Sequence, residues 1–241
     1  MNISQEKIAI ANLEIDVIRK QIKNMHLAVY PPTGRIRLSA PLATDYDVMR
    51  LFVISKLGWI KKHIRNFMEQ ARETPRMYVS GESHYFEGKR YLLKVIEQKK
   101  GVNRVESSGA KYIYLYVRST TSTKERARLM REWYRAQLKK RIPPLLEKWE
   151  TIMGVQSNDW MVKLMKTKWG TCNIEQKRIW LNLELAKKPT LHLEYVIVHE
   201  LTHLLERNHN ERFVQYLNQF MPKWRLHRAA LNALPLGDME E

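Results

Sequence analysis

The stretch YVIVHELTHLLERNHNERF, residues 195–213, is the most informative segment of the chain. It contains the pattern H-E-x-x-H, with His199, Glu200 and His203 inside an apolar run. Residues four apart share one face of a helix, so the two imidazoles can reach one point while the carboxylate projects beside them. Without partners these polar groups would carry a desolvation cost in so apolar a helix, and a metal ion satisfies both histidines. The pattern predicts a Zn2+ site with an open position for water, in which Glu200 is the general base.

The third ligand is expected to be His209, which follows His203 at the spacing of H-E-x-x-H-x-x-G-x-x-H sites. Glu206 occupies the glycine position of that pattern, so the turn is expected to use Asn208, which tolerates left-handed backbone. Two alternatives stay open. In the first, hydrogen bonds alone satisfy the histidines. In the second, the zinc is purely structural and takes a fourth ligand, for which Cys172 is the one cysteine in the chain.

The segments around this helix predict an α+β protein. Strand-like runs occur at residues 13–19, 25–30, 35–41, 91–97 and 111–118, and the second and third of these are expected to form a hairpin. One helix is expected from residue 44 or 45 to about residue 73, and a longer one begins near residue 123, with a break or kink at Pro143 and Pro144. Residues 160–173 and 177–185 are expected to be two strands, followed by helices at 191–205 and 211–221.

The bulk composition, 44% hydrophobic and 28% charged over 241 residues, is that of an ordinary folded protein. The net charge of +17 is spread over both halves, and it suits nucleotide, nucleic-acid or other polyanion partners as well as a merely basic surface. A single cysteine excludes an intrachain disulfide and suits a reducing compartment. We find no signal peptide and no apolar run of ~20 residues, so we expect a cytoplasmic protein that does not span a membrane.

Three motifs carry a resemblance to a known family. They are KTKWGTC (residues 166–172), RIWLN (178–182) and the stretch quoted above. They resemble the YgjP-like metallopeptidase family, whose pattern is W-G-S-C, then I-x-L-N, then H-E-L-x-H-L-x-x-x-N-H-x-x-x-F; Thr171 stands where serine is usual. GWIKKH, FEGKRYLL and REWYR also agree, so the resemblance covers nearly the whole chain.

The resemblance implies a zincin-like catalytic region similar to the WLM and SprT-like peptidases. It would comprise residues 123–241, after a β-rich N-terminal region with a helix at residues 1–122. No Pro/Gly/Ser linker separates the two regions, which can therefore pack as one unit. Carried onto this chain, the family pattern makes His199, His203 and His209 the zinc ligands and Glu200 the base.

In such folds an edge strand beside the metal can hold an extended peptide by strand addition. KWGTCN or RIWLN is the expected position of that strand, and core packing is the favoured role of Trp169 and Trp180. Asn182 also suits a polar anchor between strand and helix. The candidate substrate-binding residues are Trp169, Gly170, Thr171, Cys172 and Asn182.

The leading hypothesis is a zinc-dependent hydrolase of metallopeptidase type, in which metal-bound water activated by Glu200 attacks a peptide carbonyl. Tyr216, Arg225 and His227 are the candidates for stabilising the negative charge on the carbonyl oxygen. One alternative is a nucleotide phosphoanhydride hydrolase that uses the same site, although the sequence has no Gly-rich phosphate loop.

A third hypothesis is a basic nucleic-acid-associated module. Its contacts would come from Trp59, Trp133 and Tyr134, which lie near lysines and arginines in the sequence. This hypothesis requires a basic surface that leads toward the metal site.

Overall fold

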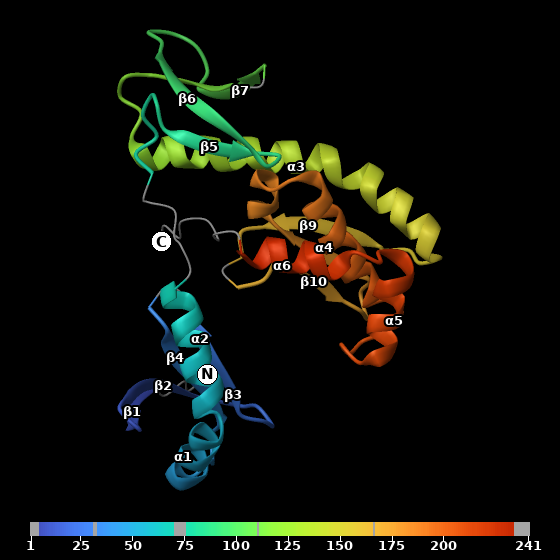
Figure 1. Cartoon of the computed structure of the whole chain (residues 1–241). Coiled ribbons are helices and arrows are strands. Elements are labelled where there is room, and N and C mark those ends of the chain that lie inside the picture. The colour runs from blue at the N-terminus through green and yellow to red at the C-terminus, as the bar shows by residue number, and fades with distance from the viewer. Residues whose placement is uncertain (1–4, 31–32, 70–75, 110, 166, 234–241) are drawn as a thin grey trace. The chain divides into compact units, whose positions relative to one another are not determined.

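A computed structural model describes residues 5–30, 33–69, 76–109, 111–165 and 167–233 (Figure 1). The chain divides into two compact units, residues 1–71 and residues 72–241. Small sheets combine with several short helices and one long helix, so the expected α+β class is confirmed. The division falls before the expected boundary at residue 122, because the strands that precede that residue pack on the long helix that follows it.

The first unit is a four-stranded sheet with two helices. Its strands, in the order β1-β2-β4-β3, are β1 (Gln5–Ile10), β2 (Leu13–Lys20), β4 (Arg35–Pro41) and β3 (His26–Tyr30). β3 and β4 pair antiparallel, which confirms the expected hairpin. Alternate residues of the strands, among them Val17 and Leu38, form a core with Met49 and Ile60 from the helices.

The helix expected from residue 44 or 45 is divided in two. α1 spans Tyr46–Ser55 and α2 spans Leu57–Glu69. Lys56 between them has φ −107° and ψ 4°, which is outside the helical range, and its N–H bonds to the carbonyl of Val53. The expected end near residue 73 lies outside the described residues.

The second unit begins with a sheet that lies along one long helix (Figure 1). Its strands, in the order β5-β6-β8-β7, are β5 (Ser83–Phe86), β6 (Lys89–Glu97), β8 (Tyr112–Val117) and β7 (Arg104–Ser108). β8 alternates strictly, so that Ile113, Leu115 and Val117 are buried and join the core formed with the helix. The tyrosines between them face the other side of the sheet.

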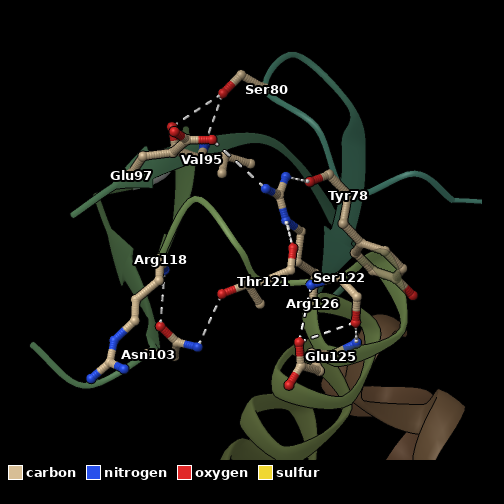
Figure 2. Close-up of polar contacts among 10 residues, drawn as sticks. All are labelled: Tyr78, Ser80, Val95, Glu97, Asn103, Arg118, Thr121, Ser122, Glu125 and Arg126. Carbon is tan, nitrogen blue, oxygen red and sulfur yellow. Dashed lines mark hydrogen bonds and ion pairs between the residues drawn. The ribbon is translucent and has the colours of Figure 1, made fainter. Parts of the chain in front are cut away.

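The long helix α3 (Thr123–Met153) is fixed to this sheet at its N-terminus (Figure 2). Ser122 and Glu125 form a reciprocal capping box that satisfies two backbone N–H groups. Arg126 donates hydrogen bonds to the carbonyl oxygens of Thr121 and Tyr78, so the first turn of α3 is tied to the segments that follow and precede the sheet in the sequence.

Of the break or kink expected at Pro143 and Pro144, the break does not occur, because α3 continues as one helix through both prolines to Met153. Proline removes a backbone hydrogen bond, but Ile142 and Leu146 on either side are buried in the core. The packing of this apolar stripe outweighs the local preference. α3 ends at Gly154, whose φ of 65° is left-handed.

The remaining elements form the region of the H-E-x-x-H motif. They are β9 (Asp159–Lys163), β10 (Gly170–Asn173), β11 (Arg178–Asn182), the 3-10 helix η1 (Leu183–Lys187), α4 (Thr190–Thr202), α5 (Glu211–Phe220) and α6 (Trp224–Ala233). The strand order is β10-β11-β9, so the single strand expected over residues 160–173 is in fact two strands on opposite sides of β11. β10 is an edge strand. Within the described part of the chain, no helix is long and apolar enough to cross a membrane.

Candidate metal centre

Three histidines converge at the C-terminal end of α4. His199 lies in the last turn of the helix, His203 is its C-cap, and His209 lies in the loop before α5. One ring nitrogen from each lies within 4.8 Å of the others, and the Nε2 atoms of His199 and His209 are 3.1 Å apart. The expected set of three imidazoles is therefore brought together.

The ring of Phe213 in α5 packs against all three imidazole rings. Its ring centroid lies 5.0 Å from that of His199, 4.8 Å from that of His203 and 4.6 Å from that of His209. Phe213 is buried. A rigid aromatic contact with all three imidazoles restricts their rotation and fixes where their nitrogens meet.

Hydrogen bonds hold the turn that brings His209 back to α4. Glu206 accepts the N–H of Asn208 through its carboxylate at 3.1 Å, and Asn210 caps α5 by accepting the N–H of Phe213 at 3.0 Å. Asn208 does not have a positive φ, so the expected left-handed turn residue is wrong. The side chain of Glu206, at the position where the longer motif has glycine, stabilises the turn instead.

The protonation of the histidines suits metal binding. Burial lowers the pKa of His199 to about 3, and burial also lowers the pKa values of His203 and His209. Nδ1 of His203 lies 3.3 Å from the carbonyl oxygen of Glu206. A carbonyl oxygen only accepts, so this contact places the proton on Nδ1 and leaves Nε2 free to bind a metal.

The donor set fits a divalent cation with an open coordination position. Among the described residues, no fourth histidine, cysteine or carboxylate joins the three-histidine group. Cys172 stays outside it, and burial followed by the charge of Glu200 raises the pKa of its thiol to about 11. This geometry favours three protein ligands over a closed structural site.

Glu200 lies beside the cluster and against the backbone of β10. It is 4% exposed, and burial raises its pKa to about 8, an effect that the charge of Lys168 opposes. A Cβ atom at Gly170 would lie 2.6 Å from its Oε1 atom. Only glycine at position 170 allows the carboxylate to approach the edge strand so closely.

The cluster opens into a cleft of about 1050 Å³. Its walls come from the loop before β10 and β10 itself, from α4, and from the sides of α5 and α6 that face α4. Trp169, Gly170, Thr171 and Cys172 all line this cleft, together with the three histidines and Glu200. The edge strand and the polar groups thus share one cavity.

The sequence of this chain matches one protein family over most of its length. Residues 23–234 match the family model described as YgjP-like, metallopeptidase domain. The chain belongs to the YgjP-like metallopeptidase family. No curated protein matches the sequence.

Solved structures similar to this YgjP-like chain include two metallopeptidase zymogens. Abylysin of Pyrococcus abyssi is 19% identical, with a TM-score of 0.35 over 36% of this chain and 89% of its own. Jannalysin of Methanocaldococcus jannaschii is 20% identical, with a TM-score of 0.33 over 36% of this chain and 90% of its own.

Asn182 of the YgjP-like chain has structural contacts instead of a place in the cleft lining. It is fully buried, and its Nδ2 donates to the carbonyl oxygens of Met165 at 2.9 Å and Lys168 at 2.7 Å. Its Oδ1 accepts the N–H groups of Met165 and Glu184. Asn182 therefore fixes the loop that leads into β10 and acts on the cleft only through that loop.

The candidates for stabilising a carbonyl oxygen lie elsewhere. Tyr216 accepts a hydrogen bond from Arg212 and Arg225 donates to Asn218, and neither these two nor His227 lines the cleft as described. Two residues that the motifs did not single out, Tyr195 and Arg228, do line it. The signal for Arg228 was its spacing from Trp224 and Leu231, which places all three on one face of α6.

Proposed function

We propose that this protein is a zinc-dependent peptidase. The observation that carries the proposal is the meeting of three neutral imidazoles with the buried carboxylate of Glu200 in a cleft bounded by an edge strand. Membership in a metallopeptidase family supports the reaction class. Metal identity, mechanism and residue roles are our inference.

His199, His203 and His209 would hold the metal. Three nitrogen donors and an open position are the arrangement of hydrolytic zinc sites. When bound there, Zn2+ would supply a Lewis acid that lowers the pKa of water and polarises a carbonyl group. Phe213 and the Glu206 carbonyl fix the rings before the ion arrives, which lowers the reorganisation that binding requires.

Glu200 would be the general base and then the general acid. It would take a proton from the attacking water and deliver it to the leaving amine. Its burial and its contact with β10 hold the carboxylate at one position. A metal ion on the neighbouring histidines would oppose the effect of burial on its pKa and favour the ionised carboxylate.

The substrate would lie along β10 in an extended conformation. β10 is hydrogen-bonded to β11 on one side and is the edge of its sheet on the other. Strand addition at this edge would bring a peptide carbonyl next to Gly170 and Glu200, because these two residues are in direct contact. Main-chain recognition of this kind gives affinity with modest dependence on sequence.

Arg228 is the group that we assign to charge stabilisation at the carbonyl oxygen. It lines the cleft from α6, and its charge acts on His199 and His209. No hydrogen bond or ion pair engages its guanidinium within the described part of the chain. A fixed cation facing a developing oxyanion is one of the largest contributions to catalysis of acyl transfer.

The cations of the cleft make nucleotide phosphoanhydride hydrolysis the second candidate. Lys168, Arg207 and Arg228 line the cavity, whereas its carboxylates are Glu175 and the buried Glu200. Metal ions and cations together stabilise transferring phosphoryl groups. Incubation with nucleoside triphosphates and a panel of divalent metals tests this candidate, and no release of phosphate or pyrophosphate would count against it.

The first experiment is elemental analysis of protein purified without chelator, with cleavage of casein followed by mass spectrometry. The wild type and Glu200→Gln should each contain a single Zn2+ per chain, whereas His199→Ala and His209→Ala should lose it. All three variants should lose cleavage, and His26→Ala, an exposed histidine of the first unit, should behave as wild type.

Two results would contradict the proposal. Wild-type protein that takes up no metal on reconstitution would mean that the histidines serve packing. Full turnover by Glu200→Gln would remove the general-base role. Circular dichroism of each variant separates loss of metal from loss of fold.

A further inference from the structure

A row of tyrosines lies on the face of the β5–β8 sheet opposite the buried side of β8. Tyr112, Tyr114 and Tyr116 alternate along β8 with the buried residues, and all three are half-buried. The ring centroids of successive tyrosines lie 6.1 Å and 6.3 Å apart. α3 covers the other face, so the rings form a continuous aromatic row on the outer face of the sheet.

Cations from the neighbouring strands lie over these rings. Lys94 of β6 places Nζ 3.9 Å from the centroid of the Tyr112 ring, and Arg104 of β7 places its guanidinium carbon 3.9 Å from that of Tyr116. Nζ of Lys111 lies 5.4 Å from the Tyr112 centroid. The cations thus follow the row on both sides, and one of them lies at its end.

The charge of this face is positive. In the strands β6, β7 and β8, which the structure describes in full, strand alternation places a single carboxylate, that of Glu106, on the tyrosine side. It forms an ion pair with Arg104 at 2.7 Å. Lys94 and Lys111 have no carboxylate partner on this face, so the rings lie in a positive field.

Aromatic rings in a row with cations beside them match the chemistry of a single nucleic-acid strand. Unpaired bases stack on aromatic side chains, and the phosphates between them are attracted to lysine and arginine. The bases of a duplex are stacked on one another and cannot use the rings. An acidic protein surface would form ion pairs with the cations but would not stack on the aromatic rings.

We propose that the tyrosine face, comprising Tyr112, Tyr114 and Tyr116 with Lys94, Arg104 and Lys111, binds single-stranded nucleic acid. Bases stack on the rings, and the lysines and the arginine contact the backbone. This site differs from the three aromatic residues expected from the sequence, because Trp133 and Tyr134 are buried in the core and Trp59 lies on α2 of the first unit. The proposal does not rest on peptidase activity.

The test is fluorescence anisotropy of the full chain with labelled oligothymidylate, oligouridylate and a duplex of equal length. The wild type should bind the single strands more tightly than the duplex. Tyr114→Ala should weaken single-strand binding about 10-fold, from the known effect of losing one base–aromatic stack. Tyr114→Phe keeps the ring and should bind as wild type, which separates stacking from folding.

Two controls define the surface. Tyr46→Ala removes an exposed tyrosine of α1 and should leave binding unchanged. Lys94→Gln should reduce the slope of log affinity against log salt by about 0.7, as one lost phosphate contact does for single strands. No binding by the wild type at low salt would overturn the proposal. Equal affinity for duplex and single strand, with no effect of Tyr114→Ala, would also overturn it and leave a merely basic surface.

Discussion

The contact between Gly170 and Glu200 makes a sharp prediction about catalysis. A Cβ atom at position 170 would lie 2.6 Å from Oε1, 2.8 Å from Cγ and 2.9 Å from Cδ of Glu200, whereas ordinary contact begins at 3.4 Å. Gly170→Ala therefore forces the carboxylate and the strand apart by about 0.8 Å. A displacement near 1 Å of a catalytic group costs on the order of 10²-fold in rate, which corresponds to about 2.7 kcal/mol.

Steady-state kinetics on a fluorogenic peptide selected from the casein digest would measure this effect. kcat should fall about 10²-fold, because the substitution displaces the carboxylate that we propose as the general base in the transition state. Zinc content should stay at the wild-type level, since the three atoms nearest to a Cβ at position 170 all belong to Glu200 and none to a histidine. Gly58→Ala is the matched control, because a Cβ there meets nothing within 4 Å.

A double-mutant cycle shows whether the two residues act together. Glu200→Asp retracts the carboxylate, so its cost should be smaller in the Gly170→Ala background than in the wild type. An unchanged kcat in Gly170→Ala, or strict additivity in the cycle, would refute the argument from close approach.

Three further predictions concern charge and buried polar groups. Arg228→Gln should lower kcat about 10²-fold at constant zinc content, measured by peptide kinetics and elemental analysis. Asn182→Ala should lower the free energy of unfolding in urea by about 2–3 kcal/mol, because it leaves buried backbone groups without partners, whereas the exposed Asn173→Ala should cost less than about 0.5 kcal/mol. Burial, followed by the charge of Arg76, lowers the pKa of His84 from 6.5 to about 4. Below pH 6.5 His84 therefore binds a proton in the unfolded chain but not in the folded one. The contribution of His84 to the free energy of unfolding is complete above pH 6.5 and falls toward pH 4. The loss should reach about 2 kcal/mol near pH 5, and His84→Gln should flatten this part of the pH profile, measured by urea unfolding. An unchanged profile in that variant would assign the loss to other groups.

The cluster of three histidines could be predicted from the sequence because its parts are local. His199, His203 and His209 lie within eleven residues, and helical spacing alone brings the first two together. Phe213 completes the site only a few residues later. The same locality explains why the strands with strict alternation, such as β8, were predicted correctly.

The surroundings of the cluster could not be predicted in the same way, because they depend on contacts between distant segments. Periodicity did not show that residues 160–173 leave one side of β11 and return on the other. That course depends on Asn182, whose side chain holds the intervening loop by its backbone groups. Arg228 reaches the cleft only because α6 packs on α4, a contact that no local pattern contains.

Within the second unit, α3 contacts the elements that carry both proposed sites, the three-histidine cleft and the tyrosine face. One side of this helix packs on β7 and β8, beneath the tyrosine row, and it also contacts η1 and α4, which carry the catalytic region. Both sites pack on the same hydrophobic core, so a substitution at either one can lower the stability of the whole unit. Tyr114→Ala can therefore lower the amount of folded protein without changing the cleft. Coupling of function is a different matter, because it requires an element with two arrangements that both ligands bias. α3 is continuous, has one face buried along its length and is capped at both ends. We therefore expect an oligonucleotide bound at the tyrosine face to leave kcat on a short peptide unchanged.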